Sequence, residues 1–275
     1  GDDLCDFGRM MGHSLAAMVY HDQDDAERAQ SHLDEGWERI EYYYSRIAGP
    51  DATCVTRCVS VLAIEARSKI TGETLPNDYF WRHWEASLAI PEDALRLIDR
   101  GAEWQYLHPV DGVDPAVTDP DFQQTFFSRD YDDHAWSTGR EDDGPVSGFG
   151  YGDPVAVVWE KPEKGQRKTA YLRCHFDTEQ EFSDLRLRMQ CDDGAIVYLD
   201  GQEVGRLGIP PKATEGYELM TGGMYEMSGS DERRWRVVWL GGRLPAGSHV
   251  LAISLHNISP ESSDLRIGNM VLFGS

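Results

Sequence analysis

The chain has 275 residues, of which 48 are acidic and 26 basic, so its formal net charge at pH 7 is −22. This length suits one large domain or two ordinary ones, and the carboxylate excess disfavours nucleic acid as a partner, because phosphate contacts need clustered Lys and Arg. No segment is long and apolar enough to span a bilayer, so we expect no transmembrane segment.

The first hundred residues have the periodicity of helices. Apolar residues recur at helical spacing within residues 24–50, and this run ends at Gly49-Pro50. Further helices are predicted over residues 4–20, 50–72 and 91–100. The sequence therefore predicts a small antiparallel helical domain over residues 1–101.

After residue 101 the apolar residues alternate with polar ones, and Gly, Pro and Asp turns separate the short runs. The runs lie at residues 168–176, 185–191, 234–240, 249–257 and 265–273. Many short strands without intervening helices indicate an all-β sandwich, and this region is long enough for a jelly roll. The expected fold class is thus α+β in two domains, a helical bundle followed by a jelly-roll sandwich over residues 102–275.

A series of motifs in this second region comes in a characteristic order. They read EWQYL, DYDDHAW, GFGYGD, AYLRCHF, CDDGAIVYLDGQEV, PAGSHVLAISLHN and SSDLRIGNMVLFG. Together they resemble the galactose-binding-like jelly-roll module of many secreted bacterial proteins, over about residues 102–275. The resemblance implies a location outside the cytoplasm, in the periplasm, at the cell surface or secreted. It says little about function, because such modules serve binding, spacing and assembly.

The Asp192-Asp193-Gly194 stretch is predicted to be a hairpin turn, with a positive φ at Gly194, and Asp200-Gly201 forms the next turn. Similar turns in related sugar-binding modules hold calcium and ligand through their acidic side chains. Asp192 and Asp193 are therefore candidates for a sugar site, together with two tyrosines of a long loop, Tyr217 and Tyr225.

A second acidic group comprises Asp130, Asp132 and Asp133. Three carboxylates at this spacing are candidate ligands for calcium, a hard ion that prefers six to eight oxygen ligands. The alternative is a turn capped by an Asp side chain, with Trp136 packed beneath it. Calcium is the one cofactor that the sequence suggests.

His256, at the end of a strand, is a candidate to hydrogen-bond Asp264, or else one of Asp192 and Asp193, in a polar cluster. A buried cluster of this kind fixes loops when it is fully hydrogen-bonded. A catalytic His–Asp pair is the alternative, but no nucleophile is tied to it by sequence, so the structural role is favoured.

The cysteines allow two kinds of pairing. Cys54 and Cys58 are four residues apart and share a helix face, where they would be soft-metal ligands or buried thiols. In an oxidising compartment, a disulfide between Cys5 and one of them is the further alternative. Cys174 and Cys191 fall on the inward register of their strands, either as free core thiols or as a cross-strand disulfide.

These observations favour a non-catalytic, extracytoplasmic binding or assembly module that binds carbohydrate through jelly-roll loops. The first alternative is a structural subunit that docks to a protein partner through its acidic helical domain, and this alternative predicts an exposed apolar stripe on the helices. The second alternative is an accessory domain of a separately encoded hydrolase.

Overall fold

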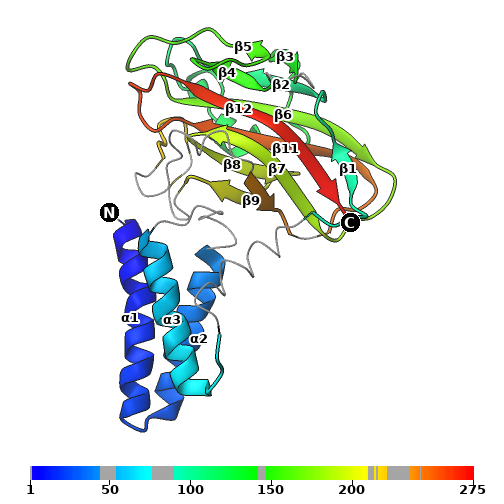
Figure 1. Ribbon diagram of the computed structural model, residues 1–275. Coiled ribbons are helices and arrows are strands. Elements are labelled where there is room, and N and C mark those ends of the chain that lie inside the picture. Colours follow the sequence, from blue (N-terminus) through cyan, green and yellow to red (C-terminus); the bar gives the residue numbers. More distant parts are fainter. Residues whose placement is uncertain are drawn as a thin grey trace. The chain divides into compact units, whose positions relative to one another are not determined.

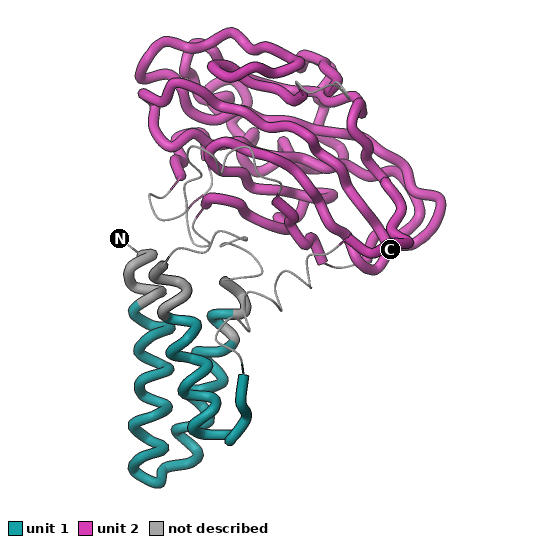
Figure 2. Tube along the Cα trace, viewed as in Figure 1, with its two compact units in different colours: residues 1–89 teal, residues 90–275 magenta. Residues whose placement is uncertain are grey.

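The computed structural model describes residues 2–43, 54–75, 90–141, 147–209, 214, 216–221, 236–241 and 243–275. The protein is of mixed α and β structure and mostly β. It divides into two compact units, residues 1–89 and 90–275 (Figure 2). None of the helices in the described ranges combines the length and the apolar composition that a membrane crossing requires.

The described part of the first unit contains the helices α1 (Asp2–Asp22), α2 (Ala26–Tyr43) and α3 (Cys54–Thr71). Their common core is built from small and branched side chains, with Ala17, Leu33 and Ala66 at 3% exposure or less. Alanine at two of these positions lets the helices approach closely. The side chains of Cys54 and Cys58 lie outside the described part of α3, so their predicted pairing stays a prediction.

The sequence predicted a fourth helix over residues 91–100, and this prediction is wrong. Strand β1 (Leu95–Ile98) lies there instead and pairs antiparallel with the end of β12 (Leu265–Gly274). Main-chain pairing with a distant strand outweighs the local helical pattern of so short a segment. Strand β1 belongs to the second compact unit, which begins at residue 90. That the units are separate domains stays a prediction.

The second unit is a sandwich of two sheets with six strands each (Figure 1). Sheet 1 has the order β10 (Arg236–Trp239), β7 (Leu185–Asp192), β12, β4 (Phe149–Tyr151) and β5 (Val157–Val158), with β1 also on β12. Sheet 2 has the order β3 (Ser137–Arg140), β2 (Glu103–Leu107), β6 (Thr169–Thr178), β11 (Gly247–His256), β8 (Gly194–Leu199) and β9 (Gln202–Leu207). The chain passes repeatedly from one sheet to the other between β6 and β12, so the predicted β-sandwich is confirmed.

The main hydrophobic core lies between the sheets and follows the alternation seen in the sequence. Leu172 of β6 and Leu187 of β7 are both fully buried in it. Cys174 and Cys191 enter the same core from opposite sheets, and both are free thiols. Burial raises the pKa of each thiol to about 12, so both stay protonated. Of the two alternatives drawn from the sequence, the structure has the free thiols.

A second cluster covers the outer face of sheet 2. Part of this cluster comes from residues 108–136, the cover segment, which connects β2 to β3 and contains η3 (Pro115–Val117) and α5 (Phe122–Thr125). Other members belong to the sheet itself, namely Tyr171, Ile196, Tyr198 and Ala252. Phe122 and Phe126 pack edge-on against Tyr171 of β6, with ring centroids 4.8 and 4.9 Å apart. These contacts hold the cover segment on the sheet.

Glu141, directly after β3, is a buried carboxyl group at 4% exposure. Its Oε1 accepts a hydrogen bond from the Met270 backbone nitrogen at 3.2 Å, and its Oε2 accepts one from the Ser147 hydroxyl at 3.1 Å. Met270 follows Asn269, whose φ is 56°, where the pairing of β12 with β7 changes register. The carboxyl thus satisfies a backbone donor that the irregular strand leaves unpaired. Burial raises the pKa of Glu141 to about 7.

Candidate functional site

An open pocket of about 560 Å³ lies on sheet 2, where β6 ends and β11 begins. Its walls are Arg129, Asp130, His175, Phe176, Asp177, Ser248, His249 and Val250. His175 faces Val250 across the two strands, and Asp177 faces Ser248. The cover segment supplies the first two wall residues, and the sheet supplies the others.

His175 is oriented by a buried carboxylate. Its Nε2 lies 2.7 Å from Oδ2 of Asp133, whose side chain is 7% exposed. Burial raises the pKa of Asp133, but hydrogen bonds from Arg173 and His175 lower it by more, so the carboxyl is ionised. The His175 side chain is 45% exposed, and its Nδ1 forms no hydrogen bond with a described residue. This nitrogen is free to contact a ligand.

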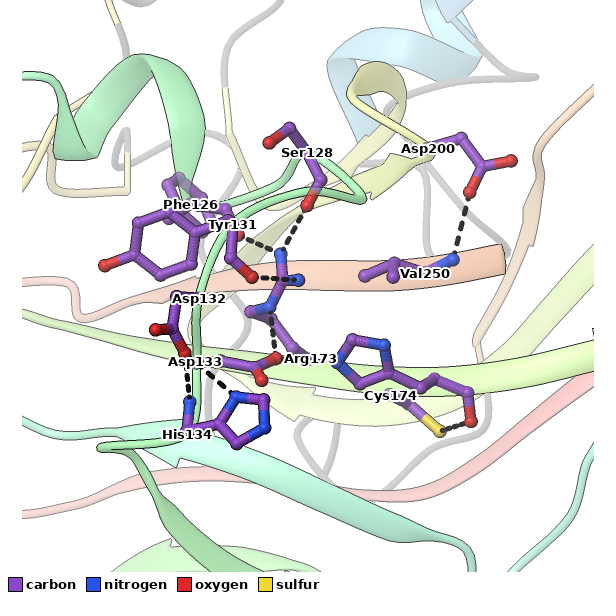
Figure 3. Close-up of polar contacts among 11 residues, drawn as sticks. Phe126, Ser128, Tyr131, Asp132, Asp133, His134, Arg173, Cys174, Asp200 and Val250 are labelled. Atoms are coloured by element: carbon purple, nitrogen blue, oxygen red, sulfur yellow. Dashed lines mark hydrogen bonds and ion pairs between the residues drawn. The ribbon is translucent and has the colours of Figure 1, made fainter. Parts of the chain in front are cut away.

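Arg173 anchors the cover segment to β6 (Figure 3). Its side chain is fully buried, and its Nε donates to Oδ2 of Asp133 at 2.6 Å. The remaining guanidinium nitrogens donate to the backbone carbonyl groups of Phe126, of Ser128 at 3.0 Å and of Tyr131 at 3.4 Å. One guanidinium therefore satisfies a carboxylate and three carbonyl oxygens in a place without water access, which is a use that suits arginine.

His249 forms the opposite side of the pocket. Its Nδ1 lies 2.6 Å from Oδ2 of Asp200, and its Nε2 lies 2.9 Å from the Pro245 carbonyl oxygen. Both contacts are with acceptor oxygen atoms, so the ring is held from two sides. The other Asp200 oxygen accepts from the Val250 backbone nitrogen at 2.9 Å (Figure 3). This imidazole is held rigidly and has no nitrogen left for a ligand.

Ser248 is not arranged as a nucleophile. Its hydroxyl donates to Oδ1 of Asp177 at 2.6 Å, and its carbonyl oxygen accepts from Arg129 at 3.1 Å. A serine nucleophile needs a hydrogen bond to a general base such as an imidazole. In the described pocket walls no imidazole contacts this hydroxyl. The pocket instead presents fixed donors and acceptors.

The three aspartates proposed as calcium ligands have different partners. Asp130 lines the pocket. Oδ1 of Asp132 accepts a hydrogen bond from the backbone nitrogen of His134 at 3.1 Å, and the ring Nδ1 of His134 lies 2.9 Å from the same oxygen. Asp133 bonds to Arg173 and His175. Within the described ranges no three His, Cys, Asp or Glu side chains converge as metal ligands. Trp136 is buried in the cluster under this turn, as in the structural alternative.

The predicted hairpin at Asp192-Asp193-Gly194 is wrong. Strand β7 belongs to sheet 1 and β8 to sheet 2, so this stretch carries the chain from one sheet to the other. Gly194 does not have a positive φ. A Cβ at this position would lie 2.6 Å from Cγ2 of Thr221, so packing requires the glycine. The second turn is confirmed, because Asp200 and Gly201, with φ of 50° and 89°, connect the paired strands β8 and β9.

We expect Gly194→Ala to lower the free energy of unfolding of the sandwich by about 1–3 kcal/mol, the usual cost of overpacking. The added methyl group would overlap Thr221 and approach Cδ1 of Ile209 to 2.9 Å. Urea unfolding followed by tryptophan fluorescence measures this loss. A variant as stable as the wild type would contradict the packing role of Gly194.

The acidic pair itself is buried, with Asp192 at 4% and Asp193 at 5% exposure. Oδ2 of Asp193 accepts from the Ile258 backbone nitrogen at 2.7 Å. Tyr217, the described tyrosine of the predicted sugar site, is 1% exposed in the cluster outside sheet 2. These three side chains do not form an open loop-edge site. Tyr225 lies outside the described residues.

His256 and Asp264 do not form the predicted pair. The His256 ring contacts the Ser254 hydroxyl at 2.8 Å through Nε2 and the Thr169 hydroxyl at 3.0 Å through Nδ1. Asp264 accepts from the Ser263 hydroxyl at 2.8 Å. Burial lowers the pKa of His256 to about 4, so the ring is neutral and structural.

Apart from Asp130, the pocket residues were missed, because the residues that they contact are far apart in the sequence. The alternation in residues 168–176 already places Arg173 and His175 on the face opposite Leu172 and Cys174. The signal that the sequence offered was an arginine and a histidine on one strand face, together with the acidic run that ends at Asp133. The pairing between them spans 40 residues.

No protein-family model and no curated protein matches this sequence. Among solved structures, Bacteroides uniformis β-glucuronidase 2 is similar at 14% identity and a TM-score of 0.34, over 66% of this chain and 18% of that one. A β-glycosidase from Bacteroides vulgatus has 13% identity and a TM-score of 0.34, over 64% and 20% of the two chains. A β-glucuronidase from Ruminococcus gnavus has 10% identity and a TM-score of 0.37, over 68% and 30%. The chain thus spans less than a third of each protein, and a likeness at such TM-scores assigns neither a family nor an activity.

Proposed function

We propose that the sandwich is a non-catalytic carbohydrate-binding module that holds a sugar residue in the pocket between β6 and β11. The observation that carries this proposal is a set of preoriented polar groups around an open space of about 560 Å³. We further propose, on the motif resemblance, that it is a galactose-binding-like module acting outside the cytoplasm.

The chemistry of the walls suits a polyhydroxylated ligand. A sugar hydroxyl both donates and accepts, and the carboxylates of Asp130 and Asp177 accept while the guanidinium of Arg129 donates. Phe176 and Val250 add apolar surface for the C–H face of a sugar ring. Pockets of a few hundred cubic ångströms with a small number of fixed polar groups are typical of small-molecule sites.

Preorganisation supports binding at this place. The ion pair of Arg173 with Asp133 fixes His175, and the bonds of Asp200 and Pro245 fix His249. Side chains that are already ordered lose little conformational entropy when a ligand binds. A non-catalytic role is supported by Ser248, whose hydroxyl is bonded to a carboxylate and not to a base.

A glycan array probed with the full chain tests the proposal, followed by calorimetric titration of each glycan that binds. We expect His175→Ala and Asp177→Asn each to weaken binding by about tenfold or more, since each removes a hydrogen bond involving a group that can carry charge. His134→Ala is the matched control, because His134 is 95% exposed and does not line the pocket.

Two outcomes would count against a sugar site here. One is an array on which no glycan binds, with and without calcium. The other is a glycan whose affinity is the same for His175→Ala, Asp177→Asn and His134→Ala, which would place the binding surface elsewhere. Unfolding curves of the variants separate a loss of binding from a loss of fold.

A further inference from the structure

Two polar side chains of the pocket between β6 and β11 use their hydrogen-bond donors within the protein. The Ser248 hydroxyl donates to Oδ1 of Asp177 at 2.6 Å. The ring nitrogens of His249 lie 2.6 and 2.9 Å from oxygen atoms of Asp200 and Pro245. A hydroxyl has one hydrogen to donate, and each imidazole nitrogen forms one hydrogen bond. Neither side chain therefore offers a donor to a ligand.

The acceptors of the pocket, in contrast, are open to a ligand. Asp130 lines the pocket and forms no hydrogen bond with a described residue. Asp177 uses Oδ1 for the Ser248 hydroxyl, and its Oδ2 forms no hydrogen bond with a described residue. An ionised carboxylate accepts hydrogen bonds and donates none. The two side chains therefore present acceptor oxygens to whatever occupies the pocket.

The buried pair of Arg173 and Asp133 makes His175 a third acceptor. Asp133 is ionised despite its burial, because hydrogen bonds lower its pKa, so its Oδ2 accepts from Nε2 of His175 at 2.7 Å. The neutral imidazole carries a single N–H hydrogen, and this contact places it on Nε2. Nδ1 then has a lone pair, and it forms no hydrogen bond with a described residue on a side chain that is 45% exposed. The fully buried Arg173 thus determines the hydrogen-bonding character of the pocket surface.

Arg129 supplies the guanidinium group of the pocket walls, and its charge is matched within the protein. Its Nε lies 3.6 Å from Oδ1 of Asp200, and its Nη1 donates to the Ser248 carbonyl oxygen at 3.1 Å. Asp130 and Asp177 form no ion pair with a cation in the described part of the chain. A ligand carboxylate or sulfate would meet these two carboxylates at short range, where like charges repel strongly.

We propose that the pocket selects sugars with free hydroxyl groups and no acidic group, and that it rejects uronic acids and sulfated sugars. This inference rests on the proposed carbohydrate-binding function. The sugar hydroxyls donate to the two carboxylates and to Nδ1 of His175, while a hydroxyl oxygen accepts from the remaining N–H groups of Arg129. A site built to receive hydroxyl hydrogens discriminates strongly against an analogue that lacks them, because its polar groups are then left unpaired.

The acceptor state of His175 can be measured without a ligand. NMR spectra of the isotope-labelled full chain distinguish protonated from unprotonated ring nitrogens by their chemical shifts. The signals of His175 are those that disappear in His175→Gln. We expect the neutral ring to carry its hydrogen on Nε2, as the contact with Asp133 requires. A hydrogen on Nδ1 would overturn the inference, whether or not the chain binds sugars.

A glycan array on which each neutral sugar stands beside its uronic acid, its sulfate ester and its O-methyl ether measures the selectivity. We expect the neutral sugar with free hydroxyls to bind about tenfold more tightly than each of the three derivatives, or better. A derivative that binds as tightly as its parent sugar would overturn the selectivity and leave the carbohydrate-binding function standing. An array on which nothing binds would overturn both.

Asp130→Asn connects the selectivity to the charge of the pocket. The variant loses one of the two unmatched charges, so its preference for neutral over acidic sugars should fall severalfold. Sodium chloride should narrow the preference of the wild type, because salt screens the repulsion. Asp99→Asn is the matched control, since Asp99 is 55% exposed, follows β1 and does not line the pocket. A preference that Asp130→Asn leaves unchanged, or that Asp99→Asn lowers equally, would also overturn the inference.

Discussion

Replacing Arg173 with methionine should lower the free energy of unfolding of the sandwich by about 3–5 kcal/mol, the usual result of removing one partner of a buried ion pair. Methionine keeps much of the volume but leaves Asp133, at 7% side-chain exposure, with the His175 ring as its remaining side-chain contact of this kind among the described residues. Three carbonyl oxygens of the cover segment lose their donor at the same time. Both effects arise in the folded state and have no counterpart in the unfolded chain.

Urea unfolding followed by tryptophan fluorescence measures this loss. Arg140→Met is the matched control. Arg140 forms an ion pair with Glu103, and the two side chains are 68% and 47% exposed. Exposed ion pairs contribute about 0–1 kcal/mol to the free energy of unfolding. The pKa of Asp133 is lowered in the folded state, so its contribution is full above the ordinary carboxyl pKa and is lost as the pH falls through the lowered value. Equal losses for Arg173→Met and Arg140→Met would show that the buried pair does not anchor the cover segment.

We also expect a large change in stability when Glu141 is replaced by glutamine. Its pKa is about 7 in the folded state against 4.5 as the ordinary value, so the folded state holds the proton longer as the pH rises. The wild type therefore loses stability between pH 4.5 and about 7, by roughly 3 kcal/mol for a shift of this size. Glu141→Gln keeps an acceptor oxygen for the Met270 nitrogen and has no proton to lose. We expect it to be more stable than the wild type by this amount at pH 8.

The quantity to measure is the difference in free energy of unfolding between Glu141→Gln and the wild type at each pH. Burial lowers the pKa of both His108 and His256 to about 4, and these rings contribute stability that rises with pH over part of the same range. Their contribution cancels when Glu141→Gln is compared with the wild type at each pH. Glu103→Gln, at an exposed carboxyl, serves as the control. A difference that does not change with pH would contradict the raised pKa of Glu141.

Periodicity predicted the sandwich well, because alternation reports which side chains are removed from water. Leu172 and Cys174, assigned inward from the pattern, are both in the core. The pattern does not report which strand lies beside which. Residues 95–98 became a strand through their pairing with β12, and Asp192-Asp193-Gly194 connects two sheets although its composition is that of a hairpin turn. Turn chemistry acts over a few residues, while sheet membership depends on partners far along the chain.

The pocket also depends on contacts between distant segments, which sequence alternation does not report. Sequence alternation places His175 outward, but its orientation depends on Asp133, and the ionisation of Asp133 depends on Arg173. The sequence shows three polar residues in two separate motifs. The fold makes them one hydrogen-bonded unit, and only then does an exposed imidazole acquire a fixed direction.

The cover segment has a consequence for ligand binding. Arg129 and Asp130 belong to this segment, while His175, Asp177 and Ser248 belong to the sheet beneath it. A ligand that touches both sets binds only while the segment is docked, so binding and docking are thermodynamically linked and each strengthens the other by the same factor. Opening of the segment would then empty the pocket without unfolding the sandwich. The aromatic packing of Phe122 and Phe126, which touches no ligand, would in this way set part of the affinity.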